Sequence, residues 1–434
     1  MSDAFQFTEH ADTRLDERME TGQGPHGLNT ILLPKPDRAQ KMAFLAVRFG
    51  SVDLSFRPDG TSEDVDVPPG TAHFLEHELF QKEEQDMMQV FAARGAEANA
   101  MTMYGLTGFY AATNDRLTPS IAPLFHTVFD PYFDAERVKR EKQIIRQELL
   151  MYLDRPGYRL YRAAMEHLFE HHPLQYDIGG SVEGIDRITP DLLEQCHASF
   201  YRPSNCYLIL AGNIDREAVL KQCETDLTER SFPETSVETR LSNDEPDTPT
   251  TSELELSFHT TRPRILVGFK KLYEEISGQE MVRREIEMVM ALEMLFGESS
   301  PFRMELYEEG LIDDSFDFQH YADEGYEFTV ISGKTDHPDR LIERIHTGIE
   351  ERSSNGISEE RFRDMKRALK GQYIRNFDSV RSNVYWLLPH CFLDVLPFDF
   401  AREIEHVTRE DLTRTLNERL APSRRITVTM RPES

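Results

Sequence analysis

The chain has 434 residues, 39% of them hydrophobic, and its 77 Asp and Glu outnumber its 49 Lys and Arg, which sets the formal net charge at −28. This length suggests two or three domains, each able to bury a core. So acidic a composition argues against a nucleic-acid partner and against adhesion to an anionic membrane. The four cysteines are scattered, without a Cys-x-x-Cys pair, and do not form a disulfide framework or a Cys-type zinc site.

The N-terminal segment is polar and acidic and lacks the apolar core of a secretory signal peptide. No run of about 18 apolar residues occurs, so we expect no transmembrane helix and no membrane partner. A cytoplasmic protein is the simplest interpretation of these features.

Two apolar segments, Leu28–Pro34 and Ala43–Phe49, are the first strand candidates. Neither these strands nor any later strand candidate is followed by a G-x-G-x-x-G sequence or a P-loop. A Rossmann enzyme or an NTPase is therefore not expected.

The segment Gly70–Lys82 contains an H-x-x-E-H pattern, formed by His73, Glu76 and His77. On a helix, His73 and His77 are four residues apart and share one face, with Glu76 beside it. Zinc binds imidazole nitrogens readily, and a neighbouring carboxylate can take a proton from water. The pattern is typical of the inverzincin peptidases, although coincidence on an amphipathic helix is the alternative.

A strongly periodic helix is predicted over Phe133–Pro156. It carries Glu141 and Glu148, seven residues apart, which is two helical turns and therefore one face. On the residues alone, this pair offers candidates for a third zinc ligand and for a carboxylate that holds a His ring. The alternative is that both face solvent, as acidic pairs on helices usually do.

The chain contains an internal repeat. Ile188–Gly212 and Val407–Pro432 both predict a capped helix, a Pro-Ser turn and an apolar strand, and Thr189 and Thr408 occupy the same place in each (408 − 189 = 219). The second half also opens with two apolar strand candidates, Leu254–Phe258 and Ile265–Phe269.

Between the two halves, Ser231–Glu253 is polar, acidic and without helical or strand periodicity, which predicts a linker. Its acidic run, Asp244–Asp247, is expected to be solvated. The linker separates an N-terminal half at residues 1–230 from a related C-terminal half at residues 254–434.

Four segments, in this order, resemble the pitrilysin/insulinase zinc peptidases: GTAHFLEHELFQK from Gly70, NAMT from Asn99, REKQIIRQE ending at Glu148, and HPLQYDIGGSVEGIDRIT from His172. The similarity is closest to the mitochondrial-processing-peptidase-like branch, particularly the YmfH-like bacterial proteins, and covers nearly the whole chain. It implies an α+β fold in which two related halves, each a mixed, largely antiparallel sheet with helices packed on it, form a two-lobed clamshell.

The resemblance also implies the roles of the candidate site residues. The zinc ligands would be His73, His77 and Glu148, with Glu148 placed 71 residues after His77 (148 − 77 = 71). Glu76 would be the general base, and Glu141 would be the auxiliary carboxylate that supports the ligands.

The family's substrate is an extended peptide that adds to the edge of the active-site sheet. The stretch Gly95–Tyr104 resembles that edge strand, and Asn99 and Ala100 occupy the substrate-contacting positions. Without the resemblance, Asn99 would be interpreted as a turn or bulge residue.

The chain departs from the family pattern in its second half, which has no H-x-x-E-H and places Gln372 opposite Glu148 in the repeat. One zinc site per chain follows. Tyr307 and Asp313 stand where active members carry an Arg and a Tyr that reach the substrate. A partner chain could supply this pair, other side chains could replace it, or the chain could be weakly active or inactive; the candidates for replacement are Arg303, Tyr321 and Tyr326.

The function expected is therefore a zinc-dependent endopeptidase acting on short or unfolded peptides. It would work as a hetero-dimer with a related zinc-free subunit, or as a homo-dimer. The alternative is a non-catalytic structural or assembly subunit of a peptidase complex that retains the zinc motif. A module that binds cationic peptides is a third hypothesis, which rests only on the net charge.

Overall fold

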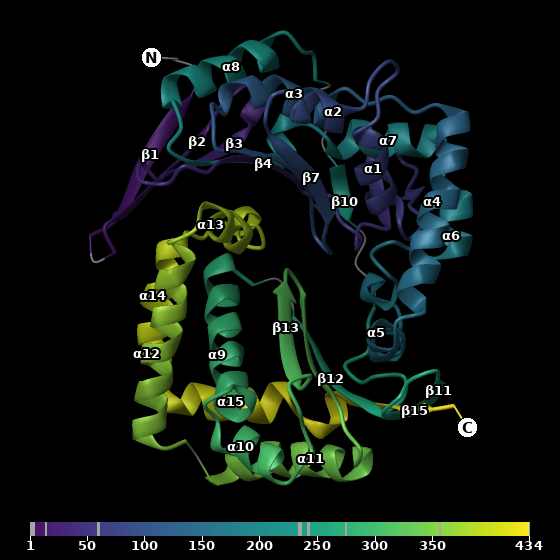
Figure 1. Cartoon of the computed structure of the whole chain (residues 1–434), viewed down its shortest axis with the longest axis vertical. Coiled ribbons are helices and arrows are strands. Elements are labelled where there is room, and N and C mark those ends of the chain that lie inside the picture. The colour runs from purple at the N-terminus through teal and green to yellow at the C-terminus, as the bar shows by residue number, and fades with distance from the viewer. Residues whose placement is uncertain are drawn as a thin grey trace. The chain divides into compact units, whose positions relative to one another are not determined.

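The structure is a computed structural model that describes residues 5–13, 15–58, 61–232, 237–240, 244–273, 276–355 and 357–433, with only the backbone described for residues 237–240, 354 and 355. The chain divides into two compact units. The first unit comprises Met1–Leu149, Asp177–Ser242 and Arg375–Phe392; the second comprises Leu150–Tyr176, Asn243–Ile374 and Leu393–Ser434. Each unit is built on one large sheet (Figure 1).

The first unit contains a seven-stranded sheet in the order β1-β2-β3-β9-β4-β8-β7. Only β3 and β9 are parallel; the other neighbours are antiparallel. Every residue of β8 is buried, as expected for a strand covered on both faces. The strands are β1 (Gln6–Asp12), β2 (Glu17–Gln23), β3 (Asn29–Pro34), β4 (Lys41–Val47), β7 (Glu97–Thr102), β8 (Thr107–Thr113) and β9 (Cys206–Gly212).

Helices pack on this sheet and enclose one hydrophobic core. They are α1 (Thr71–Leu79), α2 (Met87–Ala92), α3 (Ile121–Phe129), α4 (Ala135–Leu153, of which the part after Leu149 belongs to the second unit), α6 (Val182–Arg187), α7 (Pro190–Phe200) and α8 (Arg216–Thr228). Helix α13 (Val380–Leu387) belongs to the same unit and packs on β4 and β9. A small sheet has the order β10-β5-β6, with β5 at Ser55–Pro58, β6 at Val65–Asp66 and β10 at Val237–Arg240.

The second unit contains a five-stranded sheet in the order β11-β15-β12-β14-β13, with β11 and β15 parallel and the other neighbours antiparallel. Its strands are β11 (Glu253–Phe258), β12 (Arg264–Leu272), β13 (Asp317–Asp323), β14 (Tyr326–Lys334) and β15 (Arg425–Pro432). Its helices are α5 (Pro156–Leu168), α9 (Gly278–Phe296), α10 (Pro301–Glu308), α11 (Pro338–Asn355), α12 (Glu359–Asn376), α14 (Pro397–His406) and α15 (Arg409–Arg419).

The two units repeat one topology, which confirms the expected α+β fold of two related halves. The strand order β3-β9-β4-β8-β7 recurs as β11-β15-β12-β14-β13, with the parallel pair at the same place. Helices α7 and α15 begin alike, because Thr189 Oγ1 accepts the Leu192 N–H at 3.2 Å and Thr408 Oγ1 accepts the Asp411 N–H at 3.1 Å. Each threonine therefore caps the helix that leads into a central strand.

The halves also exchange one helix each. Helix α5 follows α4 in the chain but packs on β12 and β15 of the second unit. Helix α13 follows α12 but packs on β4 and β9 of the first unit. Because β4 and β12, and likewise β9 and β15, hold equivalent places in the two sheets, the exchange is reciprocal.

The expectation that the acidic run Asp244–Asp247 is solvated is wrong for Glu245. Its carboxylate accepts the N–H groups of Glu170, His171 and His172 at 3.0, 2.6 and 2.7 Å and pairs with the fully buried ammonium of Lys270. These donors replace water, which is why a charge can be buried here. Residues 233–236 and 241–243 of the expected linker lie outside the described residues.

Candidate metal centre

Two glycine turns set the position of α1, the helix that carries the H-x-x-E-H pattern. Gly70, just before α1, has φ = 97°, and a Cβ there would lie 2.5 Å from the Gly179 carbonyl oxygen. Gly180 has φ = 84°, and a Cβ there would overlap the Pro69 carbonyl. Both positions need glycine, since the two backbones touch and both angles are left-handed. The first turn of α1 is thereby seated against the turn that precedes α6.

Helix α1 is divided into a core face and a site face. Phe74, Leu75 and Leu79 are fully buried in the core of the first unit. His73 and His77 share the other face, with ring centroids 4.5 Å apart. Burial of the apolar face therefore fixes the direction in which both imidazoles point.

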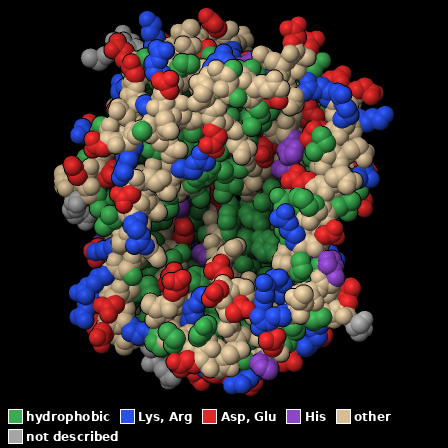
Figure 2. Space-filling model, in the orientation of Figure 1, with side chains coloured by type: hydrophobic (Ala, Val, Ile, Leu, Met, Phe, Trp, Pro, Cys, Tyr) green, Lys and Arg blue, Asp and Glu red, His purple; other side chains and the backbone are tan. Residues whose placement is uncertain are grey.

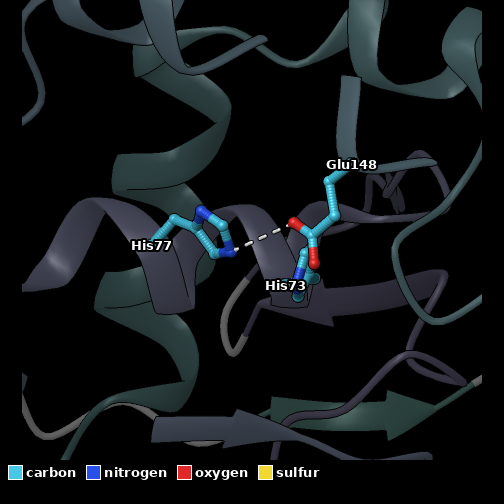
Figure 3. Close-up of side chains that lie close together, drawn as sticks. All are labelled: His73, His77 and Glu148. Carbon is cyan, nitrogen blue, oxygen red and sulfur yellow. Dashed lines mark ion pairs between the residues drawn. The ribbon is translucent and has the colours of Figure 1, made fainter. Parts of the chain in front are cut away.

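Helix α4 brings two carboxylates to these histidines. His77 Nδ1 lies 2.7 Å from Glu141 Oε1, and His77 Nε2 lies 3.8 Å from Glu148 Oε2. One ligand atom from each of His73, His77 and Glu148 lies within 4.8 Å of the others. Figure 3 shows the two imidazoles on α1 facing the Glu148 carboxylate on α4.

This donor set fits a divalent metal such as zinc. Two imidazoles and one carboxylate are the ligands of many catalytic zinc sites, with a further position left for water. The contact of His77 Nδ1 with Glu141 leaves Nε2 available to a metal ion, as a carboxylate does for many metal-binding histidines. Burial, together with the charge of His77, lowers the pKa of His73 to about 3, so this imidazole is neutral and able to ligate.

Opposing electrostatic effects act on the pKa values of His77 and Glu76. Burial alone would lower the pKa of His77, but the hydrogen bond and charge of Glu141, together with Glu76 and Glu148, raise it overall. Burial also raises the pKa of Glu76, an effect that a hydrogen bond from Thr102 opposes. A carboxylate so placed is a stronger base than one in water.

The sequence did not predict that Thr102 contacts Glu76. Its hydroxyl donates to Glu76 Oε2 at 2.5 Å, from the last residue of β7. The residue stands in the NAMT segment, but spacing along one strand does not reveal which side chain on another element it meets. The strand register that decides this is a tertiary property.

Strand β7 is the outer strand of its sheet, and in the described part of the chain β8 is its one partner. The Ala100 N–H donates to its neighbour's side chain, Asn99 Oδ1, at 2.9 Å, so it points away from β8. The backbone N–H and C=O groups of successive residues point to opposite sides of a strand. Those of Ala98, Ala100 and Thr102, called here the outward rungs, therefore face the open side of β7. Asn99 pairs in regular register with Tyr110 and is not a turn or bulge residue.

The two positions that depart from the family pattern belong to the second unit. Tyr307, on α10, is 60% exposed. Asp313 Oδ2 accepts a hydrogen bond from Arg262 Nη1 at 2.7 Å. Hydrogen bonds from Ser315, followed by this contact with Arg262, lower the pKa of the Asp313 carboxyl.

The residues considered as replacements are engaged within the same unit. Arg303 donates to two main-chain carbonyls at 3.0 Å each. Tyr321 and Tyr326 stack with ring centroids 6.1 Å apart, and their hydroxyls lie 3.3 and 3.4 Å from Asp323 Oδ2.

Comparison with known proteins defines the class to which this fold and site belong. Residues 58–181 match the family described as "Insulinase (Peptidase family M16)", and residues 187–369 match the "Peptidase M16 inactive domain". The chain belongs to the M16 family, the insulinase/pitrilysin peptidases, as the resemblance implied.

Within that family, the chain is 34% identical over 421 residues to the "Uncharacterized zinc protease YmfH" of Bacillus subtilis (strain 168), covering 97% of this chain and 98% of that protein. It is similar to the crystal structure of a putative M16-like peptidase from Alicyclobacillus acidocaldarius, with 30% identity, a TM-score of 0.90 and 100% of both chains covered. Pitrilysin matches at 17% identity with a TM-score of 0.72, covering 99% of this chain and 47% of pitrilysin, which shows the fold alone.

The surface carries charges of both signs. On the face drawn in Figure 2, red acidic and blue basic side chains are interspersed and do not separate into a basic patch. Among the described residues, no helix has both the length and the apolar character needed to cross a membrane.

Proposed function

We propose that this chain is a zinc-dependent endopeptidase that hydrolyses peptide bonds in short or unfolded peptides. The observation that carries the proposal is the meeting of His73, His77 and Glu148 within 4.8 Å, from two helices far apart in sequence. Glu76 lies beside them, held by Thr102. Membership of the M16 family and similarity to proteins named zinc proteases support the same reaction class.

In this proposal His73, His77 and Glu148 hold one zinc ion per chain, and Glu141 keeps the His77 ring in place. A zinc ion held by these residues would polarise the scissile carbonyl and lower the pKa of water. Glu76 takes the proton from the attacking water and later delivers it to the leaving amine. The Thr102 hydroxyl keeps the Glu76 carboxylate in one rotamer for both transfers.

The substrate is proposed to bind as an added strand along β7. The outward rungs at Ala98, Ala100 and Thr102 offer main-chain donors and acceptors to an extended peptide. The Asn99 carboxamide, which bonds to the Ala100 N–H, must turn away to admit it and can then contact the peptide. Recognition through the main chain demands an extended segment, which folded proteins rarely expose.

In the second half, Tyr307 stands where active family members carry the Arg, and Asp313 stands where they carry the Tyr. We therefore propose that a related subunit without the zinc motif supplies this pair in a hetero-dimer, with a homo-dimer as the alternative. Ordinary enzymatic turnover by the purified chain alone would contradict the need for such a partner. The four cysteines are all free and buried, which agrees with a cytoplasmic location.

A structural or assembly subunit that has kept the zinc motif is the second candidate function. The engagement of Asp313 with Arg262 favours it, because that side chain is occupied by an ion pair. The complete His73, His77 and Glu148 cluster favours the peptidase.

The zinc content of the purified chain tests the proposal, measured beside a Glu148→Gln variant. The control is Glu136→Gln, which removes the same charge from an exposed position of the same helix. We expect about one zinc per chain in the wild type and the control, and a weakened site in Glu148→Gln. Absence of zinc from a folded wild type supplied with the metal would favour the structural-subunit function.

A further inference from the structure

Helix α13 comes from the second half of the sequence but is anchored to the first unit (Figure 1). The ring of Tyr385 lies edge-on to those of Phe44 and Tyr110, with centroids 6.2 and 6.4 Å away. Just before the helix, the Phe377 carbonyl accepts a hydrogen bond from the buried Lys35 ammonium at 2.7 Å. Both aromatic packing and a buried polar contact therefore hold α13 in place.

From the first turn of α13, Arg381 reaches the beginning of β7. Its Nη2 donates to both carboxylate oxygens of Glu97 at 3.0 Å, and its Nη1 donates to the Tyr110 hydroxyl at 3.1 Å. Tyr110 in turn donates to Glu97 Oε1 at 2.9 Å, and the guanidinium lies over the Tyr110 ring, 5.2 Å from its centroid. Glu97, Tyr110 and Arg381 thus form a closed triangle of hydrogen bonds.

This triangle lies at one end of the strand whose other end is fixed at the candidate metal centre. Glu97 is the first residue of β7, and Thr102, which bonds to Glu76, is the last. Between them lie the outward rungs proposed to receive the substrate. An outer strand held from one side tends to fray, since only one ladder of hydrogen bonds secures it.

We infer that Arg381 is a positioning residue for the peptide-binding edge: through Glu97 and Tyr110 it keeps β7 extended, so that an added peptide meets a preformed strand. The part that concerns the substrate rests on the proposed function. The part that concerns the strand does not, because it is a statement about the free protein.

An alternative is that Arg381 and Glu97 form an exposed ion pair without consequence, as many surface pairs do. The chain offers a matched control for that alternative. Arg216 makes a comparable two-point contact with Glu20, with Nη2 to Oε2 at 2.7 Å and Nε to Oε1 at 3.2 Å. Glu20 lies on β2, at the other end of the same sheet, so the Arg216→Gln variant removes an equivalent pair away from β7.

Hydrogen exchange of the full-length protein tests the positioning role without requiring activity. In Arg381→Gln we expect the amides of Glu97, Asn99 and Met101, which face β8, to exchange about 10-fold faster than in the wild type, because the strand opens more often. The amides of α1 should keep their rates, and Arg216→Gln should leave the three β7 amides unchanged. Equal exchange at β7 in the Arg381→Gln and Arg216→Gln variants would overturn the inference.

Two further variants separate geometry from charge. Arg381→Lys keeps the charge but loses the two-point contact, so we expect an intermediate exchange rate. In a Glu97→Gln background, Arg381→Gln should raise the exchange rate of the β7 amides little further, because the ion pair is already broken. Full additivity of the two substitutions would show that Arg381 does not act through Glu97 and would overturn the triangle as the cause.

Peptide cleavage gives the second readout. With zinc content unchanged, Arg381→Gln should raise KM by about 5- to 10-fold and leave kcat within about 2-fold, since the bound peptide still meets the same catalytic groups. A fall in kcat at constant KM would overturn the positioning role. If the wild type binds no zinc and cleaves nothing, the proposed function fails, while the exchange rates of β7 still decide what Arg381 does.

Discussion

The hydroxyl of Thr102 donates a hydrogen bond to Oε2 of Glu76 across 2.5 Å, joining the last residue of the outer strand to the helix that carries the histidine pair. The contact restricts the Glu76 carboxylate without placing another charge beside it. Thr102→Val removes the hydroxyl at nearly constant volume, so we expect kcat to fall about 10-fold, by loss of orientation. Peptide hydrolysis measures it, and Thr102→Ser should restore most of the rate. Equal activity in the valine variant would remove Thr102 from this role.

Glu76 is the residue on which the proposed chemistry depends most. Glu76→Gln keeps the shape and the Thr102 contact but cannot accept a proton. We expect hydrolysis to fall by at least about 100-fold with zinc still bound, because general-base catalysis is lost. Cleavage assays and elemental analysis on the same preparation check both statements. Hydrolysis that survives in a zinc-loaded Glu76→Gln variant would assign the proton transfer to another group.

Glu141 lies 2.7 Å from His77 Nδ1, the nitrogen on the far side of the ring from Glu148. In Glu141→Gln, the zinc affinity should fall by about 10- to 100-fold, as for other carboxylates that hold a metal-binding histidine. Competition with a chelator of known affinity measures this change. The Glu136→Gln variant should keep the wild-type affinity; a similar loss in that control would point to net charge instead of the contact.

Buried His197 makes the stability of the folded chain depend on pH. Burial lowers its pKa from 6.5 to about 4, and its ring Nε2 lies 2.8 Å from the Val128 carbonyl. Below pH 6.5 the unfolded chain binds a proton that the folded chain does not, so the stability present above pH 6.5 falls as the pH approaches 4. His197→Gln keeps a donor but does not titrate.

The free energy of unfolding, measured with denaturant between pH 7 and pH 4, should therefore fall less steeply in His197→Gln than in the wild type. The two curves should differ by about 2–3 kcal/mol at the acid end, from about 1.4 kcal/mol for each unit of pKa shift. Parallel curves would show that the ring is charged in the folded protein or that its partner compensates.

The ion pair of Lys270 and Glu245 is the most deeply buried one described in the second unit, with side chains 0% and 1% exposed. Lys270→Met would leave the Glu245 charge buried with only its three amide donors, so we expect a loss of about 3 kcal/mol or more. Arg424→Met removes the partner of Asp247, which is 61% exposed, and should cost at most about 1 kcal/mol. Similar unfolding midpoints for both variants would contradict the prediction that breaking the buried ion pair costs more stability than breaking the exposed one.

The features that the sequence predicted well depend on local geometry. The four-residue spacing of His73 and His77 places both rings on one helix face whatever that helix packs against. The repeat was visible because Thr189 and Thr408 each cap a helix that runs into a strand, a signal confined to about 25 residues. Even the family resemblance depends on short segments of this kind.

Long-range packing decided the rest. Periodicity placed Glu141 and Glu148 on one face of α4, but only the docking of α4 on α1 brings one carboxylate to His77 Nδ1 and the other to within 3.8 Å of Nε2. The burial of Glu245 could not be predicted from its acidic neighbours, because its donors come from residues 170–172 and from Lys270.

The sequence by itself determined which side chains share a helix face, where the helices begin and that the chain repeats one fold, since covalent geometry and short-range hydrogen bonds set these features. Only the tertiary structure decided that α13 packs on the sheet of the first unit, that Arg381 contacts Glu97 and Tyr110, and that Thr102 reaches Glu76. Such contacts depend on how apolar faces pack across hundreds of residues, and no local spacing records that arrangement.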